Sequence, residues 1–266
     1  MFLTAIERRK DAPDPNTDGF PWSLPIVQGL RGLQFDAPVT FLIGENGSGK
    51  STLLEALAAG TNAIAAGSDD IARDPSLAAG RELARALRFS VRRHPRTRLF
   101  LRAEDVFGYV KRLAREMTEI RGIAHHFDEE LADGWGKQRA LGAINGQLRA
   151  LTGKYGDNPD GQSHGETFLA LLTRRLTPHG LYFLDEPETP LSPLRVLGLL
   201  SLLKQSVAND CQFVIATHSP LLMALPDARL LLFAEGKIEA VAFADVEHVR
   251  LTRDFLNNPE AFLRHL

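Results

Sequence analysis

Eight consecutive residues have the types and the spacing needed to hold a phosphate group. They form the loop GENGSGKS, which is followed by Thr52: Gly44, Glu45, Asn46, Gly47, Ser48, Gly49, Lys50 and Ser51. Glycines allow the backbone to curl so that consecutive N–H groups point into one anion site, and a following helix adds its partial positive charge. The pattern places Lys50 on the β- and γ-phosphates and the Ser51 hydroxyl on magnesium. We therefore predict that residues 44–52 bind a nucleoside triphosphate.

A pair of adjacent carboxylates follows a second apolar run, in the segment LYFLDEPE from Leu181 to Glu188. Four apolar residues before two acids indicate a buried strand that carries Asp185 and Glu186 at its carboxyl end. Asp185 would hold the magnesium opposite Ser51, and Glu186 would polarise a water for attack on the γ-phosphate. Two acids can also be a solvated strand end, but the phosphate loop upstream favours the chemical interpretation.

A histidine ends a third apolar run, in the segment IATHSP from Ile215 to Pro220. A lone histidine is more often structural than functional. Here His218 follows a strand that the pattern places in the same sheet, so we predict that it senses the γ-phosphate and orients the attacking water together with Glu186.

A fourth segment, QSHGE from Gln162 to Glu166, lies in a turn-rich loop before the expected helix Thr167 to Leu176. A serine and a glycine at a helix N-terminus make an anion site, which would use Ser163 and Gly165. The alternative is a helix cap by Ser163, with Glu166 completing a capping box. Both interpretations are compatible, because the capped helix orients the loop.

The elements that must position these residues follow from the apolar pattern. Three short runs that are almost wholly apolar predict central parallel strands covered on both faces, with function at their carboxyl ends: Val39–Ile43, Leu181–Leu184 and Phe213–Ala216. Helical patterns at 52–59, 76–88, 106–120 and 140–151 and strands at 230–233 and 238–243 complete the chain. We expect one α/β domain over residues 1–266 with a helical insertion at approximately 70–160.

The composition is that of an ordinary globular protein: 266 residues, 29.3 kDa, 44% hydrophobic and 24% charged residues, and a net charge of −2. The apolar runs are far shorter than the roughly 20 residues of a membrane-spanning helix, so direct membrane insertion is not expected. The N-terminus has no apolar core of signal-peptide length, which favours the cytoplasm. The single Cys211 precedes an apolar run and is expected to be a buried thiol at a strand edge.

A local excess of positive charge lies between Arg73 and Arg121, a segment that contains thirteen Lys or Arg and six Asp or Glu. Such a segment could bind nucleic acid or an acidic protein partner. The alternative is a solvated arginine-rich surface, and the helical spacing of Arg81, Arg85 and Arg88 agrees with it.

The order GENGSGKS, QSHGE, LYFLDEPE, IATHSP resembles that of the ATP-binding-cassette (ABC) ATPases: phosphate loop, signature loop, magnesium strand and switch histidine. The closest likeness is to the soluble, stand-alone bacterial ATPases of that superfamily, which are predicted ABC-type or AAA-family ATPases. These are related to ABC transporter nucleotide-binding domains and to the ATPase heads of chromosome-condensation and recombination-repair proteins. The resemblance covers Phe20 to about Pro226, and the C-terminal FLNNPEAFLRHL also looks typical of the group.

This resemblance implies a P-loop NTPase fold with a mostly parallel central sheet and an inserted helical subdomain. It implies ATP and Mg as ligands and an ATP-sandwiched homodimer, in which Ser163 and Gly165 contact the γ-phosphate held by the partner subunit. It also suggests that Phe20 or Trp22 stacks on adenine.

The sequence departs from the family pattern at several positions. His164 and Glu166 stand where the usual LSGGQ signature has a glycine and the glutamine, and Ser192 stands where transporter heads have an aspartate. No glutamine follows the run Leu99–Leu101, where a magnesium-sensing glutamine is expected, and Glu104 is the candidate substitute.

Two functions follow from these motifs. The first is ATP hydrolysis at a composite site between two copies, with Glu186 and His218 as catalytic residues and Ser51 and Asp185 on the metal. The alternative is an ATP-gated subunit that binds a membrane permease or nucleic acid with little turnover. A small-molecule kinase is disfavoured, because QSHGE and the segment around His218 would then have no role.

Overall fold

The computed structural model describes residues 1–14, 17–65, 74–130, 134–155 and 164–264. The chain divides into two units, each described here by itself. The larger combines Met1–Ala103 with Leu176–Leu266, and the smaller is Glu104–Arg175. All strands of the described residues belong to the larger unit, so the predicted phosphate loop, carboxylates and histidine are all in it.

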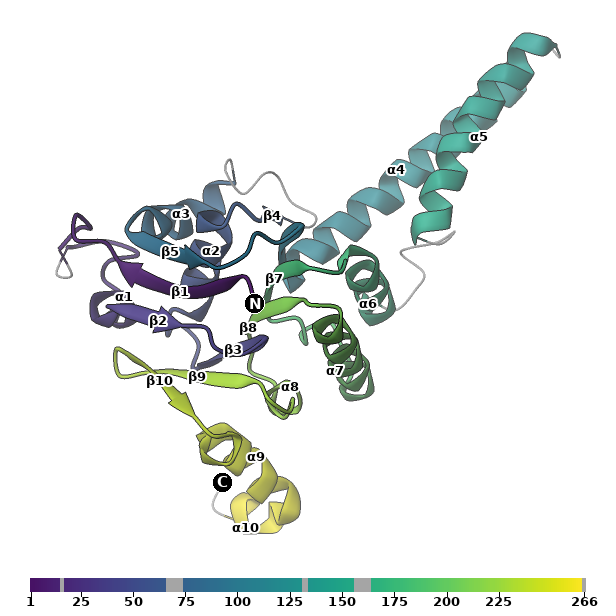
Figure 1. Cartoon of the computed structure of the whole chain (residues 1–266). Helices are drawn as coiled ribbons and strands as arrows, with labels where there is room; N and C mark the ends of the chain where they lie inside the picture. Colours follow the sequence, from purple (N-terminus) through teal and green to yellow (C-terminus); the bar gives the residue numbers. More distant parts are fainter. Residues whose placement is uncertain (15–16, 66–73, 131–133, 156–163, 265–266) are drawn as a thin grey trace. The chain divides into compact units, whose positions relative to one another are not determined.

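The larger unit is built on a seven-stranded sheet of order β10-β9-β3-β8-β7-β6-β4 (Figure 1). Every neighbouring pair in it is parallel except β10 with β9. Its strands are β3 (Val39–Gly44), β4 (Ile64–Ala65), β6 (Thr97–Arg102), β7 (Gly180–Asp185), β8 (Gln212–Ala216), β9 (Arg229–Ala234) and β10 (Lys237–Val241). The α/β P-loop fold with a mostly parallel sheet and a helical region is therefore confirmed.

The three neighbouring strands β3, β8 and β7 carry the predicted motifs. All residues of β7 and β8 are buried, and so are the first five of β3, because helices cover both faces of a parallel sheet and select continuous apolar runs. The register pairs Leu42 with Ala216 and Ala216 with Asp185. Since the strands are parallel, their carboxyl ends meet at one edge of the sheet, as the sequence predicted.

A second, three-stranded antiparallel sheet of order β2-β1-β5 lies in the same unit and consists of β1 (Leu3–Arg8), β2 (Gly32–Gln34) and β5 (Leu87–Val91). The buried side chain of Gln212, at the start of β8, joins the two sheets. Its Oε1 accepts hydrogen bonds from the N–H groups of Phe2 and Leu3 at 2.7 and 3.0 Å, and its Nε2 donates to the Leu3 carbonyl at 2.7 Å.

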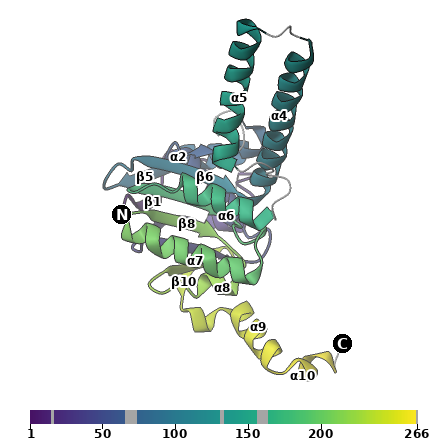
Figure 2. The ribbon, with the colours of Figure 1, turned by 90° about the vertical axis from the view of Figure 1, so that its right-hand side faces the viewer.

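Helices cover the seven-stranded sheet on both sides. Helix α2 (Lys50–Gly60) contacts β3, β6, β7 and β8, and α3 (Ala78–Arg85) packs on α2. Helix α7 (Pro193–Ala208) lies on the opposite face of the sheet (Figures 1 and 2). The main core contains Leu54, Leu57 and Phe183, and Cys211 is buried just before β8.

Short segments complete the larger unit: helix α1 (Pro25–Gly29), a 3₁₀ turn (Pro75–Leu77), α8 (Pro220–Met223), a second 3₁₀ turn (Phe243–Asp245), α9 (Glu247–Asn257) and α10 (Pro259–Leu263). The last two helices, yellow in Figure 2, follow the edge strand β10. Helix α9 buries Val249, while Leu251 and Leu256 are exposed.

The smaller unit is helical, with α4 (Ala103–Glu130), α5 (Trp135–Tyr155) and α6 (His164–Arg175). This unit begins later and ends later than the expected insertion at 70–160, because β5 and β6 precede it and α6 belongs to it. The expected helix at 76–88 is wrong at its end: α3 stops at Arg85, and Leu87 and Arg88 pair with β1. The final strand also ends earlier than expected, at Val241 rather than Phe243.

Within the described residues, no helix combines the length and the apolar character needed to cross a lipid bilayer.

Candidate functional site

The loop between β3 and α2 has the backbone that its glycines predict. Gly44, Gly47 and Gly49 have φ values of +143°, +77° and +96°, in the region that L-residues with a side chain rarely adopt. A Cβ atom on Gly44 would also lie 2.6 Å from the Phe233 carbonyl oxygen on β9. Glycine at position 44 is therefore required both by conformation and by the close approach of the neighbouring strand.

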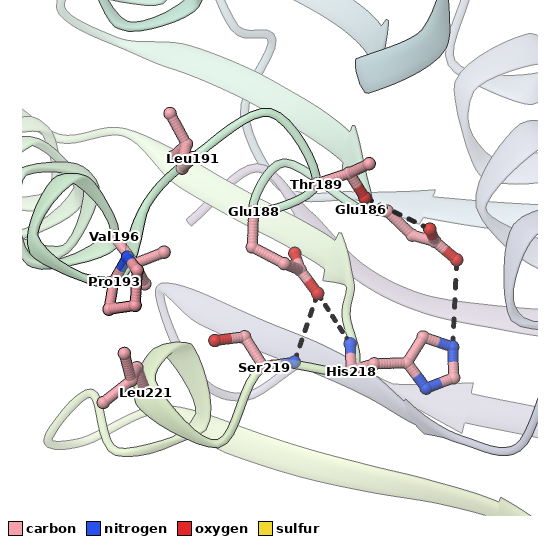
Figure 3. Close-up of a pocket in the computed structure, with 9 residues that line it drawn as sticks. All are labelled: Glu186, Glu188, Thr189, Leu191, Pro193, Val196, His218, Ser219 and Leu221. Carbon is pink, nitrogen blue, oxygen red and sulfur yellow. Dashed lines mark hydrogen bonds and ion pairs between the residues drawn. The ribbon is translucent and has the colours of Figure 1, made fainter. Parts of the chain in front are cut away.

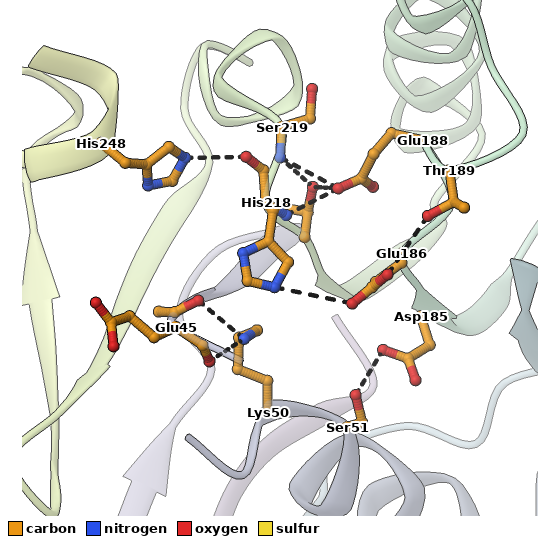
Figure 4. A network of polar contacts seen from close by, with 12 residues as sticks. Glu45, Lys50, Ser51, Asp185, Glu186, Glu188, Thr189, His218, Ser219 and His248 are labelled. Atoms are coloured by element: carbon orange, nitrogen blue, oxygen red, sulfur yellow. Dashed lines mark hydrogen bonds and ion pairs between the residues drawn. The ribbon is translucent and has the colours of Figure 1, made fainter. Parts of the chain in front are cut away.

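Lys50 is the first residue of α2, and its side chain folds back across the loop. Its Nζ donates to the carbonyls of Gly44 and Glu45 at 2.9 and 2.7 Å (Figure 4). Burial lowers the pKa of the Lys50 ammonium, whereas Glu186 and Asp185 oppose this shift. A buried cation within a loop of glycines and backbone dipoles is suited to an anionic ligand.

Ser51 and Asp185 bring the loop and the β7 carboxylate together. The Ser51 hydroxyl donates to Asp185 Oδ1 at 3.1 Å (Figure 4). One hydroxyl and one carboxylate oxygen are hard ligands of the kind that Mg²⁺ takes when phosphate and water supply the others. The two residues predicted to hold the metal therefore lie in hydrogen-bond contact.

Glu186 follows β7 in a left-handed backbone conformation, with φ +45°. Its N–H still donates to the Ala216 carbonyl at 2.9 Å, so the β7–β8 pairing extends to it. This conformation is unfavourable for a residue with a Cβ and is frequent at functional sites. The Thr189 hydroxyl donates to Glu186 Oε2 at 3.4 Å.

His218 points its ring toward Glu186, and the His218 Nε2 atom lies 3.8 Å from Glu186 Oε1 (Figures 3 and 4). Burial lowers the pKa of the His218 imidazole, and the Lys50 ammonium lowers it further, while Glu186 and Glu188 oppose the shift. The lowered pKa favours the neutral imidazole. The predicted base and the predicted switch histidine thus face each other across a short gap.

Glu188 is a residue of this site that the sequence reasoning did not assign. Its Oε1 accepts a hydrogen bond from the Thr217 hydroxyl at 2.6 Å. The same oxygen accepts from the N–H groups of His218 and Ser219 at 2.8 and 3.1 Å (Figure 3). The carboxylate therefore holds the segment that carries His218. The only available signal was a third acid in DEPE, and nothing in its spacing indicated this contact.

A hollow of about 370 Å³ opens beside these carboxylates (Figure 3). Glu186, Glu188 and His218 line its polar side, and Leu191, Val196 and Leu221 line its apolar side. Because Glu186 lines this hollow, there is open space next to its side chain.

Two buried polar atoms, one in the phosphate loop and one on the histidine that faces Glu186, are available to a ligand. Among the described residues, Ser48 Oγ and His218 Nε2 have no hydrogen-bond partner although both are shielded from solvent. Buried polar groups are normally paired, so such atoms indicate a missing ligand or water. A triphosphate would supply acceptors in a loop that already holds Lys50 and Ser51, and we conclude that the residues present fit ATP and Mg²⁺.

The remaining residues predicted for the site belong to the smaller unit or lie outside the described residues. Ser163 lies outside the described residues, and Gly165 is a buried residue in the first turn of α6 in the smaller unit. Glu104 lies in the first turn of α4 in that unit, and its metal-sensing role stays a prediction.

The stacking role suggested for Trp22 is wrong. Its ring is 4% exposed within the core, and its Nε1 donates to Glu82 at 2.5 Å. The ring therefore has no free face for adenine. Phe20 is 60% exposed and stays a candidate.

Two parts of the chain match models of protein families. Residues 26–102, which include the loop, match a model described as "AAA domain". Residues 159–224, which include the carboxylates and His218, match a model described as "AAA domain, putative AbiEii toxin, Type IV TA system". These two segments of the chain are therefore similar to AAA domains, and together they contain the phosphate loop, both carboxylates and His218.

Solved structures similar to this P-loop protein include ATP-binding cassettes. A "putative metal-chelate type ABC transporter" in an inward-facing conformation is 17% identical with a TM-score of 0.46, over 93% of this chain and 86% of that one. An ATP-binding cassette of an ABC transporter in its ADP conformation is 17% identical with a TM-score of 0.47, over 95% and 99%. The cbiO1 protein from Clostridium perfringens, part of the ABC transporter complex cbiONQ, is 15% identical with a TM-score of 0.43, over 89% and 91%. No curated protein sequence matches the chain.

Proposed function

We propose that this P-loop protein hydrolyses ATP to ADP and phosphate. The observation that carries the proposal is the approach of Glu186 Oε1 and His218 Nε2 to 3.8 Å at the sheet edge that also holds the phosphate loop. Binding of a triphosphate without hydrolysis would need only the phosphate loop with Lys50 and Ser51. The carboxylate and the neutral imidazole beside it supply what hydrolysis needs in addition: a base and an orienting group.

In this mechanism the phosphate loop holds the triphosphate through the residues 44–52, with Lys50 compensating the charge of the β- and γ-phosphates. Bound Mg²⁺, held by Ser51 and Asp185, would neutralise charge on the phosphate oxygens. Glu186 accepts a proton from water as the water oxygen attacks the γ-phosphorus. The bond from that phosphorus to the bridging oxygen breaks, and ADP leaves. His218 orients the water and donates a hydrogen bond to a γ-phosphate oxygen.

The test replaces the base while keeping its shape. Glu186→Gln should retain the affinity for Mg-ATP, measured by equilibrium binding, and lower kcat by about 10² or more. Glu239→Gln is the matched control, because Glu239 is an exposed glutamate on the edge strand β10, and it should hydrolyse ATP at the native rate. Native turnover in Glu186→Gln would eliminate Glu186 as the base and make His218 the better candidate.

The proposal extends to a homodimer that sandwiches two ATP molecules, with Ser163 and Gly165 of one copy closing on the γ-phosphate held by the other. Its support is the order of motifs that resembles ABC ATPases and the position of Gly165 in the first turn of α6, where helix N–H groups suit an anion. A partner such as nucleic acid or another protein would respond to that closure. An ATP-gated subunit with little turnover is the alternative, and a wild-type chain that binds ATP without measurable hydrolysis would favour it.

A further inference from the structure

The C-terminal helix α9 contacts the main chain of the proposed switch histidine. His248, in the first turn of α9, places its Nε2 2.9 Å from the carbonyl oxygen of His218 (Figure 4). The carbonyl can only accept, so the imidazole of His248 donates and carries its proton on Nε2. This contact joins residues 30 positions apart, one in the segment after β8 and the other in helix α9.

The peptide groups of His218 are thereby held from two directions. Glu188 Oε1, from the loop after β7, accepts from the His218 N–H, and His248, from α9, donates to the His218 carbonyl. The ring of His218 leaves the same Cα, so the two contacts fix the origin and direction of the side chain that lies 3.8 Å from Glu186. A hydrogen-bonded second residue is a common way to orient a reacting group within the tolerance that catalysis requires.

Helix α9 is anchored well enough to hold such a contact. Val246, just before it, and Val249 are 2% and 5% exposed, on either side of His248. Beyond this anchor the helix exposes Leu251 and Leu256. The turn that carries His248 is therefore packed on the rest of the larger unit, while the remainder of α9 is accessible to solvent.

We propose that His248 is a positioning residue for His218, so that the C-terminal helix sets the geometry of the nucleotide site. The inference rests on the proposed function, in which His218 orients water and contacts the γ-phosphate. If His248 has this role, the rate of hydrolysis depends on a residue that does not touch the nucleotide, whereas the affinity for ATP does not.

The first experiment separates rate from affinity. His248→Leu removes the donor while keeping a similar volume, and it should lower kcat about tenfold, because the loss of one hydrogen bond of this kind is worth about 1.4 kcal/mol. The Kd for Mg-ATP should stay within about twofold. His248→Gln carries an amide N–H at a similar reach and should retain kcat within about threefold.

His94→Leu is the matched control, because His94 is an exposed histidine in the loop between β5 and β6, and it should behave as the wild type. A purely structural role of His248 predicts loss of ATP affinity and of thermal stability together, and no rescue by glutamine. Native kcat in His248→Leu, or equal loss in the leucine and glutamine variants, would overturn the proposal.

A second readout does not require turnover. In the wild-type chain labelled with ¹⁵N-histidine, the NMR signals of His248 should show a proton on Nε2, and those of His218 should shift in His248→Leu. A His248 ring protonated on Nδ1 alone, or unchanged His218 signals in the variant, would overturn the positioning role. If the wild type does not hydrolyse ATP but these NMR results hold, only the proposed hydrolysis fails.

Discussion

Removal of the Glu188 carboxylate should destabilise the protein more than any exposed glutamate substitution. One oxygen of this side chain accepts three hydrogen bonds, from the Thr217 hydroxyl and from the N–H groups of His218 and Ser219. In Glu188→Ala the Thr217 hydroxyl, which is fully buried, loses the acceptor of its proton. His218 and Ser219 are half-buried residues, and the Ser219 N–H also donates to the Thr217 hydroxyl oxygen at 3.0 Å.

The expected magnitude follows from these three donors. A buried hydroxyl left without its partner costs about 1–3 kcal/mol, and the His218 amide, which exchanges a carboxylate for water, loses about 0.5–1 kcal/mol. The Ser219 amide keeps the Thr217 oxygen as an acceptor and adds little. The sum is about 3 kcal/mol in Glu188→Ala. Glu188→Gln keeps an oxygen acceptor but places an NH₂ group where Glu188 Oε2, a buried atom, has no partner among the described residues. We expect a loss of about 1–2 kcal/mol for this variant.

Thermal unfolding checks this ranking. At about 2–4 °C per kcal/mol for a chain of this size, Glu188→Ala should lower the Tm by about 6–12 °C and Glu188→Gln by about half of that. Glu239→Ala, at an exposed glutamate of β10, should change the Tm by no more than about 2 °C. Equal Tm values for Glu188→Ala and Glu239→Ala would refute the reasoning that Glu188 holds the His218 segment.

Three further outcomes are expected. Since burial holds the pKa of His218 below its ordinary value of about 6.5, the unfolded state binds more protons near that pH. Stability should therefore fall as the pH drops through 6.5, and less so in His218→Asn; parallel stability curves from pH 8 to 5 would contradict this. Lys50→Ala should abolish ATP binding without unfolding the chain, and Ser163→Arg should bind ATP but neither dimerise nor hydrolyse. A mixture of the two variants should regain activity at its one intact composite site or at least form ATP-dependent heterodimers. If the mixture shows no activity and forms no heterodimers, the dimer model is wrong. Finally, if the segment Arg73–Arg121 binds nucleic acid, affinity should fall steeply with salt, and absence of binding at low salt would exclude that partner.

The sequence was sufficient for the centre of the sheet because burial there is complete. The strands β3, β7 and β8 are covered on both faces, so their residues are mostly apolar, with Thr40 and Gln212 as buried polar exceptions. The apolar runs stop where a polar motif begins, at Gly44, Asp185 and Thr217. Parallel pairing then brings the motifs to one edge without further information. This is why the phosphate loop, both carboxylates and His218 could be predicted together.

The features that could not be predicted depend on tertiary contacts. Strand β5 alternates apolar and polar residues in LRFSV, and its pairing with β1, about eighty residues earlier in the chain, overrides the helical pattern that precedes it. The contacts of Glu188 and His248 with His218 span about 30 residues and leave no periodic signal. The aromatic side chain of Trp22 is of the type that stacks on a base, and only its burial beside Glu82 shows that it belongs to the core.

The side chain of Gln212 has a consequence for how the chain folds during synthesis. It binds the backbone of Phe2 and Leu3 across more than two hundred residues, so the first strand acquires this contact only after most of the chain has left the ribosome. Contacts between such distant residues form late and slow folding, because the entropy of loop closure precedes any gain from pairing. Until then the apolar residues Phe2, Leu3 and Ile6 have no finished core to enter, so the incomplete chain exposes them to chaperones and proteases.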